Sequence, residues 1–186
     1  MGEKVGYEEY TWEERTSGYR LSMEGRMTKP VPIEIEHLRI DLDGNFIPVR
    51  YEFRGTMSGI RQEIVSTISD GSVENSIRVS GHEQLSRTKI KRDALLLPNP
   101  MFAPYLVVGK RFGCGVEGKR ELMAYIIPQI ETPFILETSK QDPCRLVLHL
   151  GETRVELDIN DQGRLRRLSI PSQNLEAVDD FEAFQY

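Results

Sequence analysis

The sequence predicts a mainly β (α+β) fold, in which a single, highly curved antiparallel meander encloses one helix near residues 99–112. Three observations lead to this prediction. Apolar and polar residues alternate with a period of two over most of the chain, as they do in half-buried strands. Short turns separate the alternating segments, and such turns force neighbouring strands to run antiparallel. One central segment instead has apolar residues at helical spacing.

The length and composition fit one globular domain. The chain has 186 residues, of which 39% are hydrophobic and 28% are charged, so it can bury a core and is too apolar to be disordered. We expect residues 1–175 to form the curved domain and residues 176–186 to form an acidic and aromatic C-terminal tail.

Several segments show the alternation clearly. In residues 19–27 the odd positions are apolar or small and the even positions are polar. The further segments of this kind are 46–54, 73–79, 146–150, 155–159 and 168–170. The turns at residues 41–45, 69–72 and 160–163 contain Asp-Gly or Asn-Asp-x-Gly, which tolerate the positive φ of tight turns. The sequence therefore predicts strand after strand with little helix between them.

Two of the predicted strands change phase. The apolar residues move from odd to even positions in residues 5–12, and they do so again in residues 33–40. A shift of one residue is typical of a β-bulge or a strong bend. We therefore expect breaks near residues 8–10 and 36–38 that curl the sheet, helped by Gly25 and Gly55 within the strands.

The helix is predicted to begin at Asn99 and to end at Gly113. Asn99 fits an N-cap, and Pro100 fits the first helical position. Pro104 is awkward, but in a first turn its missing N–H would cost little. Gly113 fits a C-terminal stop. Because much of its surface is apolar, we expect this helix to be covered by the concave side of the curled sheet.

Charge and hydropathy exclude two classes of partner. The net charge is −5, and acids flank the basic runs at residues 87–92 and 164–167, so we expect no nucleic-acid partner. No stretch approaches the roughly 20 apolar residues of a membrane helix, and we expect no transmembrane segment. The first residues lack the apolar segment of a signal peptide. Two localisations stay open: cytoplasmic, or periplasmic or otherwise extracytoplasmic if an export signal was trimmed.

Cys114 and Cys144 are the two cysteines, so one intramolecular bridge can form. A disulfide would suit an exported protein. Two unpaired thiols are the alternative that the sequence favours. Neither cysteine has a histidine or a second cysteine at the spacing of a metal site, so we expect no metal.

No catalytic signature is present in the sequence. His37, His82 and His149 lie far apart, and no HxH, HExxH, P-loop, GxGxxG or nucleophile elbow occurs. Carboxylate pairs such as Glu34 and Glu36 fall on polar strand faces, where solvent surrounds them. We therefore expect a non-enzymatic protein without a cofactor.

The candidate ligand-binding residues are aromatic and methionine side chains that the curled sheet or its helix would carry. They are Trp12, Tyr19, Met23, Tyr51, Phe53, Met101, Phe102, Tyr105 and Phe112. Ligand sites are largely apolar and open at barrel mouths, so these side chains are expected to line a groove for a lipid-like ligand. In the alternative, which the sequence favours, they only fill the core.

Four stretches resemble a group of bacterial exported domains of unknown function. They are residues 2–8, 95–108, 126–129 and 157–171. Such domains are similar to spiral β-rolls and to the half-barrels of periplasmic lipoprotein carriers, in which a curved sheet cups a helix. The resemblance implies that fold and a place in the cell envelope.

The leading functional hypothesis is a non-enzymatic extracytoplasmic domain that binds a lipid-like or other apolar ligand in the concave face of its sheet. The alternative is a structural or protein-interaction module with a filled core. Such a module would bind a protein partner through its strand edges or through the C-terminal tail. An enzyme that uses scattered acids is a third and weaker hypothesis.

Overall fold

A computed structural model of the chain describes residues 3–98, 100–115, 117–127, 130–138 and 140–179. This part contains fourteen strands, one α-helix and two short 3-10 turns. The prediction of a β-dominated α+β fold with one helix is confirmed. No helix in the described ranges is long and apolar enough to cross a membrane.

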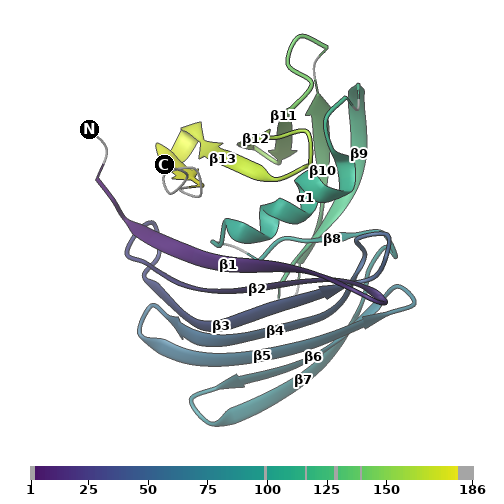
Figure 1. Ribbon diagram of the computed structural model, residues 1–186. Helices are drawn as coiled ribbons and strands as arrows, with labels where there is room; N and C mark the ends of the chain where they lie inside the picture. Colours follow the sequence, from purple (N-terminus) through teal and green to yellow (C-terminus); the bar gives the residue numbers. More distant parts are fainter. Residues whose placement is uncertain (1–2, 99, 116, 128–129, 139, 180–186) are drawn as a thin grey trace. The chain divides into compact units, whose positions relative to one another are not determined.

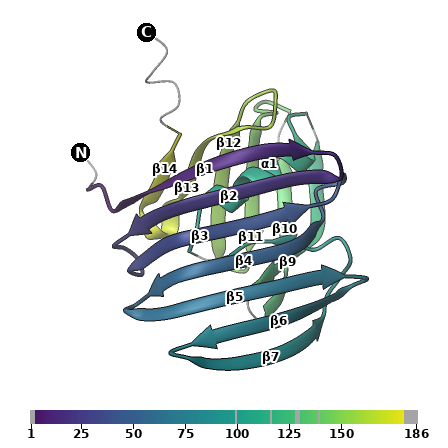
Figure 2. The same ribbon diagram turned by 60° about the horizontal axis from the view of Figure 1, so that its bottom comes forward.

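The first sheet is a seven-stranded antiparallel meander in which each strand pairs with the next one along the chain (Figures 1 and 2). Its strands are β1 (Gly6–Arg15), β2 (Gly18–Met27), β3 (Ile33–Leu42), β4 (Pro48–Met57), β5 (Ile60–Ser69), β6 (Ser72–Val79) and β7 (His82–Lys89). Tight turns join the later strands. Asp70 and Gly71 have φ of 48° and 73°, the positive values that match the twist of a hairpin.

The first sheet curls, and a β-bulge in β3 contributes to the curl. The pairing of β3 with β4 shifts between Ile35 and His37, where the sequence predicted a phase break. Beside this bulge, Ile35 pairs with Gly25 on one side and with Gly55 on the other. A Cβ at Gly25 would lie 2.5 Å from a backbone oxygen of β1, so a larger residue would push the strands apart.

The break predicted near residues 8–10 is wrong. Strand β1 pairs with β2 in one continuous register from Gly6 to Arg15. Its even-numbered residues share the face of buried Leu21, which lies opposite Trp12. Tyr7 lies on the other face and is 53% exposed. The apparent change of phase arose because one aromatic side chain of β1 faces solvent.

The second sheet also has seven strands, in the order β14-β13-β12-β11-β10-β9-β8. They are β8 (Leu95–Leu96), β9 (Gly118–Ile126), β10 (Ile130–Thr138), β11 (Arg145–Leu150), β12 (Thr153–Ile159), β13 (Leu165–Ile170) and β14 (Leu175–Val178). The meander is thus divided into two sheets, where the sequence predicted a single one. The chain turns at residues 91–94, with Ala94 N–H donating to Lys91 O at 3.1 Å, and β8 then pairs with β9 instead of β7.

The chain forms two compact units. The first comprises residues 1–103 and 125–130, and the second comprises residues 104–124 and 131–186. The expected boundary between residues 175 and 176 stays a prediction. Leu175–Val178 form β14, and residues 180–186 of the tail lie outside the described residues.

The helical segment is shorter than predicted. A 3-10 turn, Ala103–Tyr105, leads into α1 (Leu106–Phe112), and a second 3-10 turn, Pro171–Gln173, follows β13. Residues 100–102 are not helical, contrary to the prediction, and Asn99 itself lies outside the described ranges. A helix capped by Asn99 would need Pro104 to donate a hydrogen bond to residue 100, which proline cannot do. Gly113 ends the helix as predicted, with its N–H bonded to Gly109 O at 2.8 Å.

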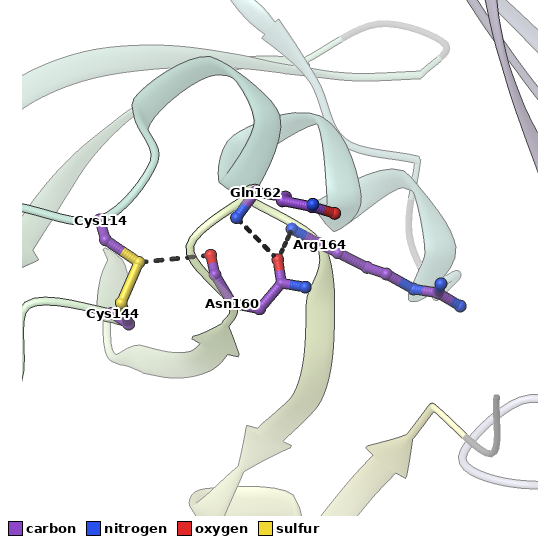
Figure 3. The surroundings of a disulfide bond; sticks show 5 residues. All are labelled: Cys114, Cys144, Asn160, Gln162 and Arg164. Carbon is purple, nitrogen blue, oxygen red and sulfur yellow. Dashed lines mark hydrogen bonds between the residues drawn. A yellow bond between two sulfur atoms is a disulfide. The ribbon is translucent and has the colours of Figure 1, made fainter. Parts of the chain in front are cut away.

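A disulfide between Cys114 and Cys144 ties the loop after α1 to the start of β11 (Figure 3). The expectation of two unpaired thiols is therefore wrong. Backbone pairing brings the two loops together, because Gly115 N–H donates to Pro143 O at 3.0 Å. Cys114 Sγ lies 3.3 Å from Asn160 O. This contact is not a hydrogen bond, since an oxidised sulfur has no proton to donate.

Candidate functional site

The inner face of the first sheet is the face that carries buried Leu21. One row of paired residues crosses this face from β1 to β7. The row is Trp12, Leu21, Ile40, Tyr51, Ser66, Asn75 and Ser86. Its side chains change from aromatic and aliphatic in the first four strands to polar in the last three. The inner face therefore offers an apolar region near β1–β4 and a polar region near β5–β7.

Four of the predicted ligand-binding residues belong to the first unit and are buried. Met23, Tyr51, Phe53 and Met101 are 4%, 1%, 3% and 3% exposed. Burial raises the pKa of the Tyr51 hydroxyl. Because neighbouring side chains surround them, these four residues form packed core in the structure.

Trp12 and Tyr19, by contrast, are only half-buried and come together with Phe46. We call these three residues the aromatic cluster. The ring centroids are 5.4 Å apart for Trp12 and Tyr19, 4.4 Å for Tyr19 and Phe46, and 6.3 Å for Trp12 and Phe46. The planes of the last two pairs differ by 9° and 22°. This near-parallel stack joins β1, β2 and the loop between β3 and β4.

Sequence reasoning missed Phe46 because it placed the residue at the start of the alternating segment 46–54, whereas the residue lies in the loop before β4. Asp43 organises this loop, since its Oδ1 accepts hydrogen bonds from the N–H groups of Asn45 at 2.9 Å and Ile47 at 2.8 Å. Phe46 N–H donates to Asp43 O at 3.1 Å. Phe46 has a φ of 61°, a conformation that is uncommon for a bulky residue. The Asp43 turn thus holds a strained backbone that places the ring on Tyr19.

An open depression of about 370 Å³ adjoins the aromatic cluster. It is lined by residues 14–19 and Gly44, so Tyr19 belongs to both features. Apart from Tyr19, its lining comes mainly from the β1–β2 turn and includes Glu14 and Arg15. An apolar surface and a polar hollow therefore lie side by side.

The other predicted residues lie elsewhere. Phe102 belongs to the first unit and is half-buried. Tyr105 and Phe112 belong to the second unit, where burial raises the pKa of Tyr105 to about 12. The guanidinium of Arg111 lies 5.4 Å from the centroid of the Phe112 ring. Within the first unit, the structure brings two of the predicted residues, Trp12 and Tyr19, into one half-buried group.

Glu8 anchors the segment that leads toward the helix. Its carboxylate accepts hydrogen bonds from Phe102 N–H at 3.0 and 3.1 Å and from Ala103 N–H at 2.6 Å. Burial raises the pKa of Glu8, and the two backbone amides oppose this shift without cancelling it. Because the carboxylate satisfies backbone donors, we assign it a structural role.

A buried polar network occupies the far part of the inner face. Ser66 Oγ donates to Asn75 Oδ1 at 2.6 Å, and Asn75 Nδ2 donates to the Tyr125 hydroxyl at 3.0 Å and to Ser86 Oγ at 3.3 Å. Ser66 is fully buried and Asn75 is 2% exposed. Burial raises the pKa of Tyr125, and the bond from Asn75 lowers it in part. The network joins β5, β6 and β7 to the end of β9.

Metal coordination has no candidate in the described part of the chain. There, no group of three or more histidine, cysteine, aspartate or glutamate side chains is arranged to hold an ion. The aromatic cluster and its depression are therefore the site that we consider further.

Comparisons with known proteins bear on the fold. The chain matches no known family model and no curated protein. It is similar to the crystal structure of a DUF1089 family protein from Pseudomonas aeruginosa, with 12% sequence identity, a TM-score of 0.62 and 92% of each chain covered. At this identity the likeness shows a common fold. That neighbour is a DUF1089 family protein, and its family is one of unknown function.

Proposed function

We propose that this protein is a non-enzymatic domain that binds a lipid-like ligand at the aromatic cluster. The observation that carries the proposal is the half-buried stack of Trp12, Tyr19 and Phe46 beside a depression of about 370 Å³. Binding sites for small molecules combine apolar walls with a few polar groups, and this place has both.

The aromatic cluster leaves apolar ring surface in contact with water. Burial of such surface is favourable by about 25 cal/mol per Å², so an acyl chain that covers the rings would gain free energy. The strained backbone at Phe46 supports the same interpretation. Strain of this kind collects at functional sites, and the Asp43 turn would hold the ring in place before a ligand arrives.

The polar depression would fix the orientation of the bound ligand. Glu14 and Arg15 lie at the β1–β2 turn, and the rings lie on the inner face next to it. A molecule with an apolar chain and a polar end fits this pair of surfaces, with the chain on the rings and the polar end in the depression. Fatty acids and phospholipids have this chemistry.

An extracytoplasmic setting is part of the proposal. The Cys114–Cys144 disulfide supports it, because disulfides persist in oxidising compartments and are rare in the cytosol. The sequence resemblance to exported bacterial domains points the same way.

The alternative function is a structural or protein-interaction module. It is favoured by the packing of Met23, Tyr51, Phe53 and Met101, which fill the interior that a deep groove would need. Under this alternative the aromatic cluster would be a peripheral part of the core, and lipids would not bind it.

Native mass spectrometry of the whole chain after incubation with fatty acids or phospholipids separates the two functions. We expect a retained lipid in the wild type and loss of retention in Trp12→Ala. Phe46→Gly is the sharper variant, because glycine accepts positive φ and so the ring is lost without strain. Tyr7→Ala is the matched control, since Tyr7 lies on β1 but on the opposite face. No retained lipid in the wild type, or equal retention in all variants, would overturn the proposal.

A further inference from the structure

The first sheet is open, with β1 and β7 as its outer strands in the described part of the chain. An outer strand presents backbone N–H and C=O groups that another strand can pair with. In β7 the first four residues are exposed, and Leu85 is 75% exposed. The second sheet ends in shorter strands, since β8 has 2 residues and β14 has 4. Strand β7 is therefore a long edge with unusual apolar exposure.

The pairing of β7 with β6 determines which backbone N–H and C=O groups of β7 point outward, away from β6. A turn at Ser80 and Gly81 joins β6 to β7, so the flanking pair Val79 and His82 exchanges hydrogen bonds. Along an antiparallel pair of strands, residue pairs that exchange backbone hydrogen bonds alternate with pairs that do not. Even-numbered residues of β7 therefore bond to β6, as the bond from Ile90 N–H to Gly71 O also indicates. The N–H and C=O of Glu83, Leu85 and Arg87 consequently point away from β6.

We propose that β7 pairs with β7 of a second copy of this chain in a two-fold antiparallel register centred on Leu85. In this register Leu85 lies opposite Leu85 of the other copy, and Glu83 lies opposite Arg87 at both ends. The pairs that exchange backbone bonds are those of the odd residues, whose groups point outward. The side chains of this face thus meet as one apolar pair flanked by two pairs of opposite charge.

The other face of the same pairing is also compatible. Gln84 lies opposite Ser86 and His82 lies opposite Thr88, which are polar pairs without a charge clash. Lys89 lies opposite Gly81, so the basic end of one strand does not meet the basic end of the other. The two-fold axis makes the contact self-complementary and closed, as expected for a homodimer.

The intrachain interactions of Glu83 and Arg87 do not compete strongly with the pairing of these residues to a second copy. Arg87 Nε lies 3.7 Å from Glu74 Oε1, and these side chains are 70% and 63% exposed. Glu83 accepts a hydrogen bond from Ser76 Oγ at 2.6 Å, which leaves its second oxygen for another donor. Exposed pairs of this kind contribute little and can rearrange.

The opposite edge does not offer the same match. Strand β1 carries four glutamates and one arginine, so two copies of β1 would repel each other. Pairing of β1 with β7 of another copy is heterologous, and it would give open chains rather than a closed dimer. The distribution of charge thus favours β7 with β7.

Sedimentation equilibrium of the whole chain over a concentration series tests this inference. We expect a monomer–dimer equilibrium. Glu83→Arg alone and Arg87→Glu alone should each raise the dimer dissociation constant by about tenfold or more, since like charges then face each other. An equimolar mixture of these two variants should form a heterodimer about as tight as the wild type, because each position 83 then again meets an opposite charge at position 87. Far-UV circular dichroism checks that the exposed substitutions leave the fold intact.

Leu85→Lys provides a second test that does not depend on the charge pairs. It replaces the apolar pair at the axis with two facing cations and should abolish the dimer. A monomeric wild type at the highest concentration would overturn the inference. So would a mass that grows beyond the dimer, or a dimer unaffected by the single reversals. None of these results depends on whether lipid binds to the aromatic cluster.

Discussion

Gly109 of α1 and Gly163 of the β12–β13 turn touch backbone to backbone. A Cβ added to Gly109 would lie 2.5 Å from Gly163 O, and one added to Gly163 would lie 2.4 Å from Gly109 O. Lys110 Nζ also donates to Gln162 O at 3.1 Å. The helix therefore sits directly on this turn because neither position carries a side chain.

Gly109→Ala should destabilise the protein despite the better helix propensity of alanine. The new Cβ would meet the Gly163 carbonyl and would lie 2.9 Å from Ile159 Cγ2, and overpacking of this kind costs about 1–3 kcal/mol. Urea unfolding followed by circular dichroism measures the change. Gly44→Ala is the control, because no atom outside Gly44 and its two chain neighbours lies within 4 Å of the position that its new Cβ would take. A stability equal to that of the wild type would contradict the close approach.

Removal of the disulfide should weaken the second unit. The bridge joins residues 30 apart in the sequence. A loop of that length restricts the unfolded chain by about 3–4 kcal/mol in the chain-entropy view. The double variant Cys114→Ser/Cys144→Ser should lower the unfolding free energy accordingly, and reduced wild type should behave like it. If the double variant and the reduced wild type both unfold at the same midpoint as the oxidised wild type, the bridge does not contribute to stability.

The stability of the protein should depend strongly on the buried polar network, although the network is small. Asn75→Ala removes the acceptor of the Ser66 hydroxyl and a donor to the Tyr125 hydroxyl. A buried polar group that loses its partner costs about 1–3 kcal/mol. Ser86→Ala, which removes only a bond of 3.3 Å to a half-buried hydroxyl, should cost less than about 1 kcal/mol. Equal losses in the two variants, measured by chemical unfolding, would argue against this ranking.

Acid should destabilise the fold in part through Asp41. Burial opposes ionisation of this carboxyl, but hydrogen bonds from Arg39 and Arg20 outweigh it and hold its pKa at about 2. A lowered pKa stabilises the folded state above the unfolded pKa of 3.8, and this contribution disappears as the pH falls toward 2. The shift corresponds to about 2 kcal/mol.

Asp41→Asn isolates that contribution. The variant should be less stable than the wild type at neutral pH, and the difference should shrink as the pH falls from the unfolded pKa of 3.8 toward the folded pKa of about 2. Unfolding free energies across this range give the test. A difference that stays constant with pH would show that the ion pair is not the cause.

The sequence predicted the strands well because the side-chain period of two survives wherever one face is buried. It also placed the β3 bulge, since the apolar positions of residues 33–40 change parity there. It wrongly predicted a break in β1, because the exposed side chain of Tyr7 was counted as an inward-facing residue. It also misplaced the helix start, because Pro104 has no backbone N–H to donate, and this outweighed the N-cap preference of Asn99.

The candidate site was only half visible from the sequence. Trp12 and Tyr19 were predictable as inner-face aromatics of two adjacent strands. Phe46 was not, because the alternation of residues 46–54 put it at the start of a strand, on the face opposite Tyr51, whereas it lies in a loop at positive φ. The one available signal was the Asp43-Gly44-Asn45 turn before it. The Cys114–Cys144 pairing likewise depends on distant loops meeting in space, which local patterns do not specify.

Trp12 offers the most direct measurement, because it is the single tryptophan of the chain and belongs to the aromatic cluster. A fatty acid brominated on its acyl chain quenches indole fluorescence only at contact. We predict saturable quenching of Trp12 by this probe, weaker quenching in Phe46→Gly, and unchanged quenching in Tyr7→Ala. Quenching that does not saturate, or that is equal in Phe46→Gly and the wild type, would contradict lipid binding at the cluster.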